Sequence, residues 1–116
     1  MNEGLVLLDE RGMVLSMNTS GKKIFGVSDH VKGEDFLLID RTSKMSKAIW
    51  NAMEGKHTEY LEERKGSQYQ FTVNSVQSGG KVLGVLILVF DISDRVFAER
   101  NRREFTANVS HELKTP

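Results

Sequence analysis

The sequence predicts an α+β fold: a five-stranded antiparallel sheet with short helices on one face, followed by a C-terminal helix. Two observations support this fold class. Two short apolar runs near the N-terminus, and three longer runs after residue 57, have the composition and period of strands. The stretch between them has the spacing and the capping residues of helices. Pairing of the first two strands with the last one closes a single sheet.

Length and composition indicate one globular domain with an appendage. The chain has 116 residues, a hydrophobic content of 39% and one proline, which is enough apolar material for a core. Its 16 basic and 16 acidic residues balance, so no overall charge favours nucleic acid as a partner. The absence of cysteine excludes disulfides and thiolate metal sites. No stretch reaches the roughly 20 apolar residues of a membrane span.

The N-terminal part predicts a β-hairpin and a short helix. Residues 4–8 and 13–17 are apolar runs, and the turn-like tetrad 9–12 between them ends in glycine. Asn18 and the two hydroxyl residues that follow it can cap a helix. That helix is expected to end at Gly26, because glycine readily takes the left-handed closing conformation.

The middle of the chain predicts a second, clearer helix. Residues 27–40 are mixed in character and are expected to form short helical turns. Residues 45–53 place apolar side chains at the spacing of an amphipathic helix. Thr42 or Ser43 can cap its start, and Gly55 can close its end.

From residue 57 onward the period changes towards two, which predicts three strands. Residues 57–64 form a polar strand, residues 65–67 a turn, and residues 69–73 alternate between apolar and polar side chains. A Gly-Gly turn at 79–80 precedes the apolar run 82–90. The nine mostly apolar residues of that run predict a central strand covered on both faces.

Two short motifs give a resemblance to a known family. The pattern Asn18-x-x-Gly21-x-x-Ile24-Phe25-Gly26, and the final strand running into Asp91-Ile92-Ser93, are similar to PAS sensor domains over about residues 3–93. Gly21 stands where the family usually has alanine, and Ser93 where threonine is commonest. The resemblance implies a PAS domain over residues 1–93, with a pocket for a small ligand between helices and sheet.

Residues 94–116 are expected to form a signalling helix that leads into a further domain. A coiled-coil seam that starts at Ile92 is apolar only at its ends, because Glu99 and Arg103 interrupt it. The charged run 99–104 is interpreted mainly as a solvated helix face. We expect a marginally packed joint that can pass a change of angle from the PAS domain along the helix.

The last seven residues carry the candidate chemistry. On a helix, His111 and Thr115 lie one turn apart on the same face, and Glu112 directly follows the histidine. A neutral imidazole can attack a phosphoryl group while an adjacent carboxylate takes or stabilises the ring proton. An exposed helix can also carry a His-Glu pair by chance, so spacing alone does not assign this chemistry.

Residues 105–116 resemble the H-box of the sensor histidine kinases of two-component systems. The resemblance implies that His111 is the phospho-acceptor and that Glu112 is the neighbouring acid/base. Thr115 matches the position that places water for dephosphorylation of the partner regulator, and Pro116 matches a helix-kinking proline. The whole protein would then use ATP and Mg²⁺, and would pass phosphate from His111 to an aspartate on the receiver domain of a response regulator.

The same resemblance implies the setting of the chain. We expect the cytoplasmic portion of a membrane-associated parent that forms a homodimer through the signalling helix, with the PAS sheet as a second candidate surface. The 116 residues contain no glycine-rich ATP-binding box, so the chain alone is not expected to autophosphorylate.

Two alternatives stay open. In one, the chain is a stand-alone PAS module for dimerisation or ligand binding, in which the His-Glu pair is incidental. In the other it binds haem or a metal, with His30, which has acidic neighbours, or His57 as a ligand. Trp50 and the other aromatic residues are assigned to core packing, and the ligand of the PAS pocket is not specified by these residues.

Overall fold

The computed structural model describes residues 3–93, and the C-terminal helix expected over residues 94–116 lies outside this part. The elements follow one another along the chain as β1 (Gly4–Asp9), β2 (Val14–Met17), α1 (Thr19–Phe25), α2 (Phe36–Ile39), α3 (Ser43–Met53), β3 (Thr58–Arg64), β4 (Ser67–Ser78) and β5 (Lys81–Asp91). The strands form one sheet in the order β2-β1-β5-β4-β3, and every neighbouring pair is antiparallel.

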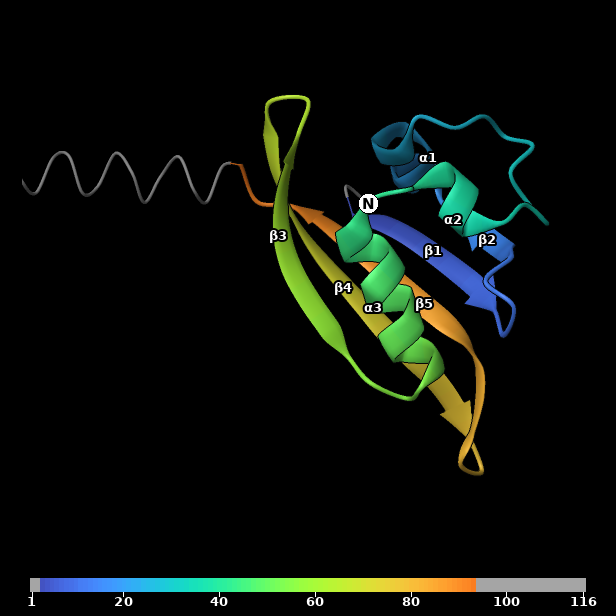
Figure 1. Cartoon of the computed structure of the whole chain (residues 1–116). Helices are drawn as coiled ribbons and strands as arrows, with labels where there is room; N and C mark the ends of the chain where they lie inside the picture. Colours follow the sequence, from blue (N-terminus) through green and yellow to red (C-terminus); the bar gives the residue numbers. More distant parts are fainter. Residues whose placement is uncertain (1–2, 94–116) are drawn as a thin grey trace, which may run out of the picture.

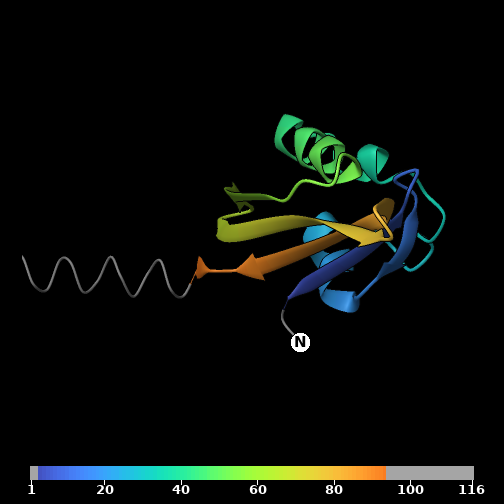
Figure 2. The ribbon, with the colours of Figure 1, turned by 90° about the horizontal axis from the view of Figure 1, so that it is seen from below.

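The helices cover one face of this sheet. In Figure 1, α3 lies over the near face of the strands, and Figure 2 shows it as a separate layer on one side of the sheet. The five-stranded antiparallel sheet with short helices on one face, predicted from the sequence, is therefore confirmed.

The hydrophobic core lies between the helices and the inner face of the sheet. Strand alternation turns every second side chain of β1, β4 and β5 inward, and α3 contributes the apolar stripe expected from its spacing. The largest of these side chains are fully buried: Val6, Leu8, Val14, Phe36, Met45, Phe71, Val73, Val85, Ile87 and Val89. Burial of one such side chain stabilises the fold by about 1.5–3 kcal/mol.

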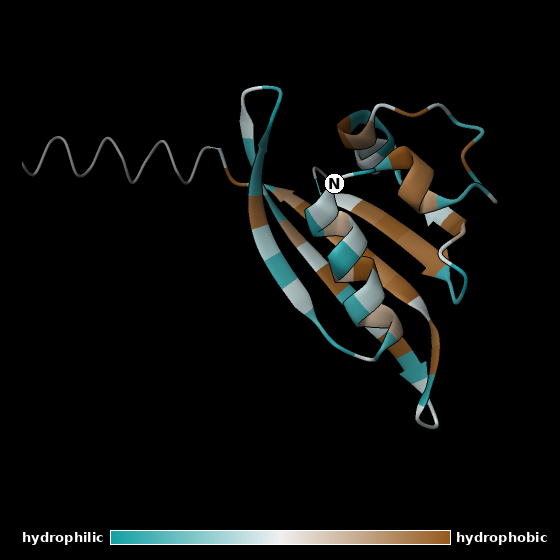
Figure 3. Cartoon of the chain, viewed as in Figure 1, coloured by the Kyte–Doolittle hydropathy of each residue, from teal (hydrophilic) through white to brown (hydrophobic). Residues whose placement is uncertain are grey.

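The outer face of the central strand differs from the prediction. In β5, Leu86, Leu88 and Phe90 alternate with buried residues and remain half-exposed. The expectation that this strand is covered on both faces is wrong for the part of the chain that the structure describes. Apolar side chains line both faces of β5, which gives the continuous apolar run in the sequence. The helices cover only the inner of these two faces. Figure 3 shows this apolar character along β1 and β5.

Asn18 ties α1 to the first strand. Its Oδ1 accepts hydrogen bonds from the backbone N–H of Gly21 (2.8 Å) and of Leu5 (2.9 Å), and its Nδ2 donates to the carbonyl of Glu3 (2.8 Å). A Cβ at Gly21 would lie 3.0 Å from this Oδ1 and 3.0 Å from Met17. The glycine therefore allows α1 to approach β1 closely, which offsets its low helix propensity.

The other predicted helix boundaries are also confirmed. The helix α1 ends at Gly26, which is left-handed with φ 67°. The hydroxyl of Thr42 caps α3 by accepting from the N–H of Met45, and Gly55 follows that helix with φ 84°. The helical turns expected within residues 27–40 are represented by α2, which Asp35 caps.

Replacement of Asn18 by alanine is expected to lower the free energy of unfolding by about 2–3 kcal/mol, since it removes a helix cap and two further bonds, one to the backbone of Leu5 in β1 and one to that of Glu3 just before it. Chemical denaturation of both proteins measures this loss. Asn51→Ala is the matched control. The Asn51 side chain, on α3, makes a single hydrogen bond of 3.2 Å, to the hydroxyl of Thr58 on β3. Equal losses in the two variants would contradict the role given to Asn18.

Candidate functional site

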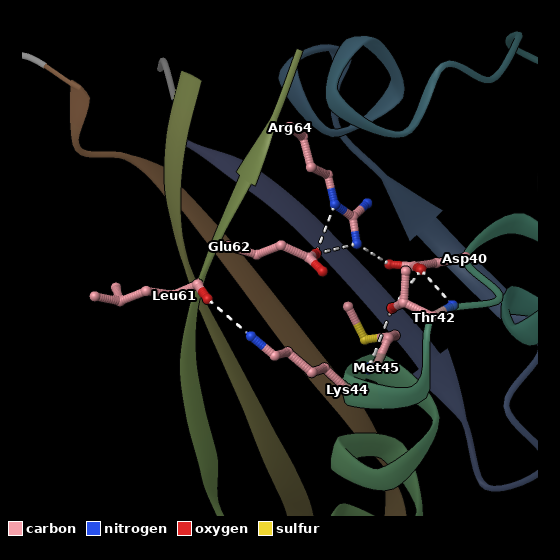
Figure 4. Close-up of polar contacts among 7 residues, drawn as sticks. All are labelled: Asp40, Thr42, Lys44, Met45, Leu61, Glu62 and Arg64. Atoms are coloured by element: carbon pink, nitrogen blue, oxygen red, sulfur yellow. Dashed lines mark hydrogen bonds and ion pairs between the residues drawn. The ribbon is translucent and has the colours of Figure 1, made fainter. Parts of the chain in front are cut away.

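A cluster of charged side chains lies where the helical layer meets the end of β3. The Nη2 of Arg64 donates to Oδ2 of Asp40 at 2.7 Å, and the same guanidinium contacts Oε2 of Glu62 through Nε and Nη2, both at 2.8 Å. The Asp40 side chain is 2% exposed, whereas those of Arg64 and Glu62 are about one-fifth exposed. Figure 4 shows the guanidinium between the two carboxylates. One cation therefore bridges the helical layer and the sheet.

The second oxygen of Asp40 reaches the start of α3. Its Oδ1 accepts from the N–H of Thr42 at 3.1 Å and from the hydroxyl of Thr42 at 2.8 Å. Thr42 is the cap residue of α3, and its hydroxyl also accepts from Met45 (Figure 4). The carboxylate thus links Arg64 to the first turn of the helix.

Aromatic rings surround the guanidinium. Its central carbon lies 4.7 Å from the ring centroid of Phe71 and 5.6 Å from that of Phe25, both within the range of a cation–π contact. The ring of Tyr60 stacks on Phe71 with centroids 4.9 Å apart. The hydroxyl of Tyr60 is buried, and within residues 3–93 it has no hydrogen-bond partner.

Two pKa values reflect this setting. Burial of the guanidinium acts to lower the pKa of Arg64, but its hydrogen bonds to Asp40 and Glu62 outweigh burial, so the pKa lies above its usual value. Burial raises the pKa of Tyr60 well above its usual value, and the negative charges of Asp40 and Glu62 raise it further, against the opposing charge of Arg64. Arginine stays charged and tyrosine stays neutral across the physiological range.

The alternation of β3 explains how these residues come together. Thr58, Tyr60, Glu62 and Arg64 pair with the inward-facing residues of β4 and so share the inner face. We did not single out Asp40, Glu62 or Arg64 from the sequence. The sequence does carry a signal for Glu62 and Arg64, because strand alternation places their opposite charges on the same face as the apolar ring of Tyr60.

The chain leaves the sheet beside this cluster. The N–H of Ile92 donates to the carbonyl of Gln68 at 2.8 Å, and the N–H of Gln68 donates to the hydroxyl of Ser93 at 2.9 Å. The N–H of Ser93 donates to Asp91 at 2.9 Å. Gln68 therefore holds the exit of the chain through both of its backbone groups, with Ile92 buried beside it.

A groove of about 450 Å³ lies at the far end of α3, next to the β1–β2 turn, and Leu37, Ile49, Trp50 and Met53 contribute to its lining. Trp50 is 69% exposed, so its assignment to core packing is wrong. It follows Ile49 on the helix and falls outside the buried stripe of α3. The other aromatic residues of the core, such as Phe36 and Phe71, are buried as expected.

The candidate residues from the sequence are placed as follows. His111, Glu112 and Thr115 lie outside the described residues, so their geometry stays a prediction. The ring of His57 is about half exposed, with Nδ1 2.6 Å from Oδ1 of Asn74 and Nε2 3.7 Å from a Glu59 oxygen. His30 lies exposed in the loop before α2. Over residues 3–93, no group of three or more potential ligand side chains is placed to hold a metal ion.

Solved structures resemble this arrangement closely. The PAS domain of the histidine kinase ThkA superposes with a TM-score of 0.66 at 15% identity, over 77% of this chain and 99% of that one. A domain of an HTR-like protein from Haloarcula marismortui gives a TM-score of 0.63 at 24% identity, over 79% of this chain and 99% of that one. The chain has the PAS fold.

Curated proteins resemble the PAS domain together with the residues that follow it. The sensor protein kinase WalK of Staphylococcus aureus strain Newman is 29% identical, and that of Staphylococcus haemolyticus is 30% identical, in alignments that cover 100% of this chain. The chain spans 20% of the length of these relatives. No protein-family model matches the sequence. Within residues 3–93, no helix has the length and apolar character required to cross a membrane.

Replacement of Tyr60 by phenylalanine is expected to leave the free energy of unfolding at pH 7 unchanged or to raise it by up to about 1 kcal/mol. The variant removes a buried hydroxyl that has no partner among the described residues, and it keeps the stacked ring. Urea denaturation at pH 7 measures the change. A loss of 2 kcal/mol or more would mean that the hydroxyl makes a stabilising bond.

The same variant is expected to be less sensitive to alkali. The raised pKa of Tyr60 contributes stability that is complete below the unfolded-state pKa of about 10 and is lost as the pH rises towards the folded-state value. Between pH 10 and 11 the wild-type protein should lose up to about 1 kcal/mol more than Tyr60→Phe. All other titrating groups are shared, so parallel losses in the two proteins would refute this assignment.

Proposed function

We propose that the chain is the PAS sensor and signal-relay segment of a sensor histidine kinase. The observation that carries the proposal is the alignment with sensor protein kinases over the whole chain, including residues 94–116, in combination with the PAS fold of residues 3–93. The exit of the chain supports it further, because Gln68 anchors Ile92 and Ser93, the residues from which the proposed signalling helix continues towards the H-box.

The proposed chemistry belongs to the parent protein. A neutral ring nitrogen of His111 attacks the γ-phosphorus of ATP, an N–P bond forms, and the P–O bond to ADP breaks. Glu112 takes or stabilises the ring proton. The phosphoryl group then passes to an aspartate carboxylate of a response regulator, which forms an acyl phosphate and frees His111. When the kinase instead dephosphorylates the regulator, Thr115 positions the water that hydrolyses this acyl phosphate.

The proposed assembly is a homodimer formed through the signalling helix, in a parent anchored to a membrane. The outer face of the PAS sheet is the second candidate surface, because five apolar side chains of β1 and β5 are half-exposed there: Leu5, Leu7, Leu86, Leu88 and Phe90. Beside them, Thr72 pairs with Leu88 across the sheet, and its buried hydroxyl has no partner within the described part of the chain.

A second candidate function is ligand binding by a stand-alone PAS module. The groove beside Trp50 favours it, since its volume of about 450 Å³ falls within the roughly 300–1,000 Å³ range of small-molecule sites. Mass spectrometry of the purified protein for bound small molecules tests this function, and absorbance and elemental analysis test haem or metal.

Replacement of His111 by glutamine in the parent kinase is expected to abolish acid-labile phosphorylation and transfer to the regulator, at least a hundredfold below the unmodified protein, because the nucleophilic nitrogen is lost. Autophosphorylation with labelled ATP measures this. His57→Gln is the matched control and should retain activity. Normal phosphate relay in the His111 variant would end the proposal. Phosphorylation of the 116-residue chain by ATP without a kinase lobe would refute the separate expectation that this chain does not autophosphorylate alone.

Replacement of Leu86 and Leu88 by lysine is expected to weaken self-association of the 116-residue chain at least tenfold, because the charges would be buried in the interface. Sedimentation at several concentrations measures this. Leu38 and Trp50, exposed on the helical side, provide the control pair when they are changed to lysine. An equal effect of the control pair, or no effect of the first pair, would exclude the sheet as the contact surface.

A further inference from the structure

The Asp40–Arg64 ion pair joins two segments of the domain that are far apart in the sequence. Asp40 lies between α2 and α3, and Arg64 is the last residue of β3, 24 residues later. The carboxylate is 2% exposed and shares its other oxygen with Thr42, the cap of α3. The position of the guanidinium is therefore tied to the position at which α3 begins.

The end of β3 moves together with the start of β4. Arg64 pairs with Ser67 across a two-residue turn, in which Lys65 and Gly66 are left-handed with φ 51° and 80°. Such a tight turn leaves little freedom between the two strand ends. A displacement of the Arg64 backbone is thus carried to Ser67 and to its neighbour Gln68.

Gln68 in turn holds the exit of the chain. Its N–H binds the hydroxyl of Ser93 at 2.9 Å, and its carbonyl accepts from Ile92 at 2.8 Å. Figure 1 shows the tip of the β3–β4 hairpin and the end of β5 at the same side of the sheet. A continuous path therefore runs from the cap of α3, through the ion pair and the hairpin turn, to Ile92 and Ser93, the residues that directly follow β5.

We propose that the Asp40–Arg64 pair is a latch that couples the α2–α3 loop to the point at which the chain leaves the PAS sheet. With the latch closed, the hairpin tip and the exit are held in one position. When Arg64 withdraws, Glu62 on the same strand keeps the guanidinium, whereas Asp40 is left with Thr42 alone. A buried carboxylate without its cation is strongly disfavoured, so opening moves the loop as well as the hairpin.

Matched variants in the 116-residue chain isolate this coupling. Arg64→Gln and Asp40→Asn each remove the bridge between loop and strand. Glu62→Gln removes a carboxylate that contacts the same guanidinium but lies on the same strand, so it changes the local charge without breaking the bridge. Each variant removes one charged group: Asp40→Asn and Glu62→Gln remove the same negative charge, so Glu62→Gln is the charge-matched control for Asp40→Asn, whereas Arg64→Gln removes the positive charge.

Amide hydrogen exchange provides the measurement. The amides of Gln68 and Ile92 are compared with that of Ile87 in the centre of β5, because global destabilisation accelerates exchange at Ile87 at least as much as at the sheet end and so cannot raise the ratio. We expect the ratio of Gln68 and Ile92 exchange to Ile87 exchange to rise at least tenfold in Arg64→Gln and in Asp40→Asn, and less than twofold in Glu62→Gln. The double variant should show no more than either single variant.

An unchanged ratio in the two bridge variants, or an equal rise in Glu62→Gln, would overturn the latch. Should a bridge variant fail to fold, Arg64→Lys replaces it, since lysine keeps the charge but lacks the planar fork that spans both carboxylates. An intermediate rise of at least threefold is then expected, and no rise overturns the proposal.

The meaning of the latch for signalling rests on the proposed function, and a second measurement separates the two. In the parent kinase, Arg64→Gln is expected to change phosphorylation of His111 at least threefold in either direction, while Glu62→Gln leaves it within a factor of two. A parent in which His111 never carries phosphate refutes the proposed function, whereas the exchange ratios decide the latch in either case.

Discussion

The burial of one carboxylate, that of Asp40, is the constraint on which the arrangement of helices and sheet depends. An ionised carboxylate with 2% exposure is tolerated only beside a cation and hydrogen-bond donors. Arg64, the last residue of β3, supplies the cation, so the end of this strand must lie beneath the α2–α3 loop that carries Asp40. Thr42 supplies both donors to the other oxygen, which places the start of α3. The charged cluster thereby specifies the relative position of three segments, beyond any net stability that it adds.

The hydrophobic core and this cluster act in different ways. Apolar burial between α3 and the sheet is large and non-directional, so it favours contact but leaves the helix free to slide by small amounts. The hydrogen bonds of Asp40 and Arg64 are directional and short, and they exclude most of these displacements. The rings of Phe71 and Phe25 close the remaining space around the guanidinium. Packing thus brings the layers together, and the ion pair selects one register.

Local patterns were enough to predict most elements, because each is encoded within a few neighbouring residues. Asn18 and Thr42 mark helix starts, Gly26 marks a helix end, and alternation marks the strands of the five-stranded sheet. The Asp40–Arg64 contact could not be predicted, since no local pattern links residues 24 positions apart. Trp50 was assigned wrongly because its aromatic character was taken as a sign of packing, although the helical spacing leaves it outside the apolar stripe of α3. The predicted roles of His111, Glu112 and Thr115 stay predictions, because those residues lie outside the described part of the chain.

The type of contact at the latch determines how it can open. An apolar contact loosens gradually, because each small separation loses only a fraction of the dispersion energy. A buried ion pair behaves differently, since a slight separation removes a short hydrogen bond and leaves Asp40 without a cation in a poorly solvated site. Intermediate positions are therefore the least favourable, and the pair tends towards closed or fully rearranged states. A relay built on such a pair converts a small movement of the α2–α3 loop into a discrete change at the point where the chain leaves the sheet. Packing alone would give a graded change there, proportional to the movement of the loop.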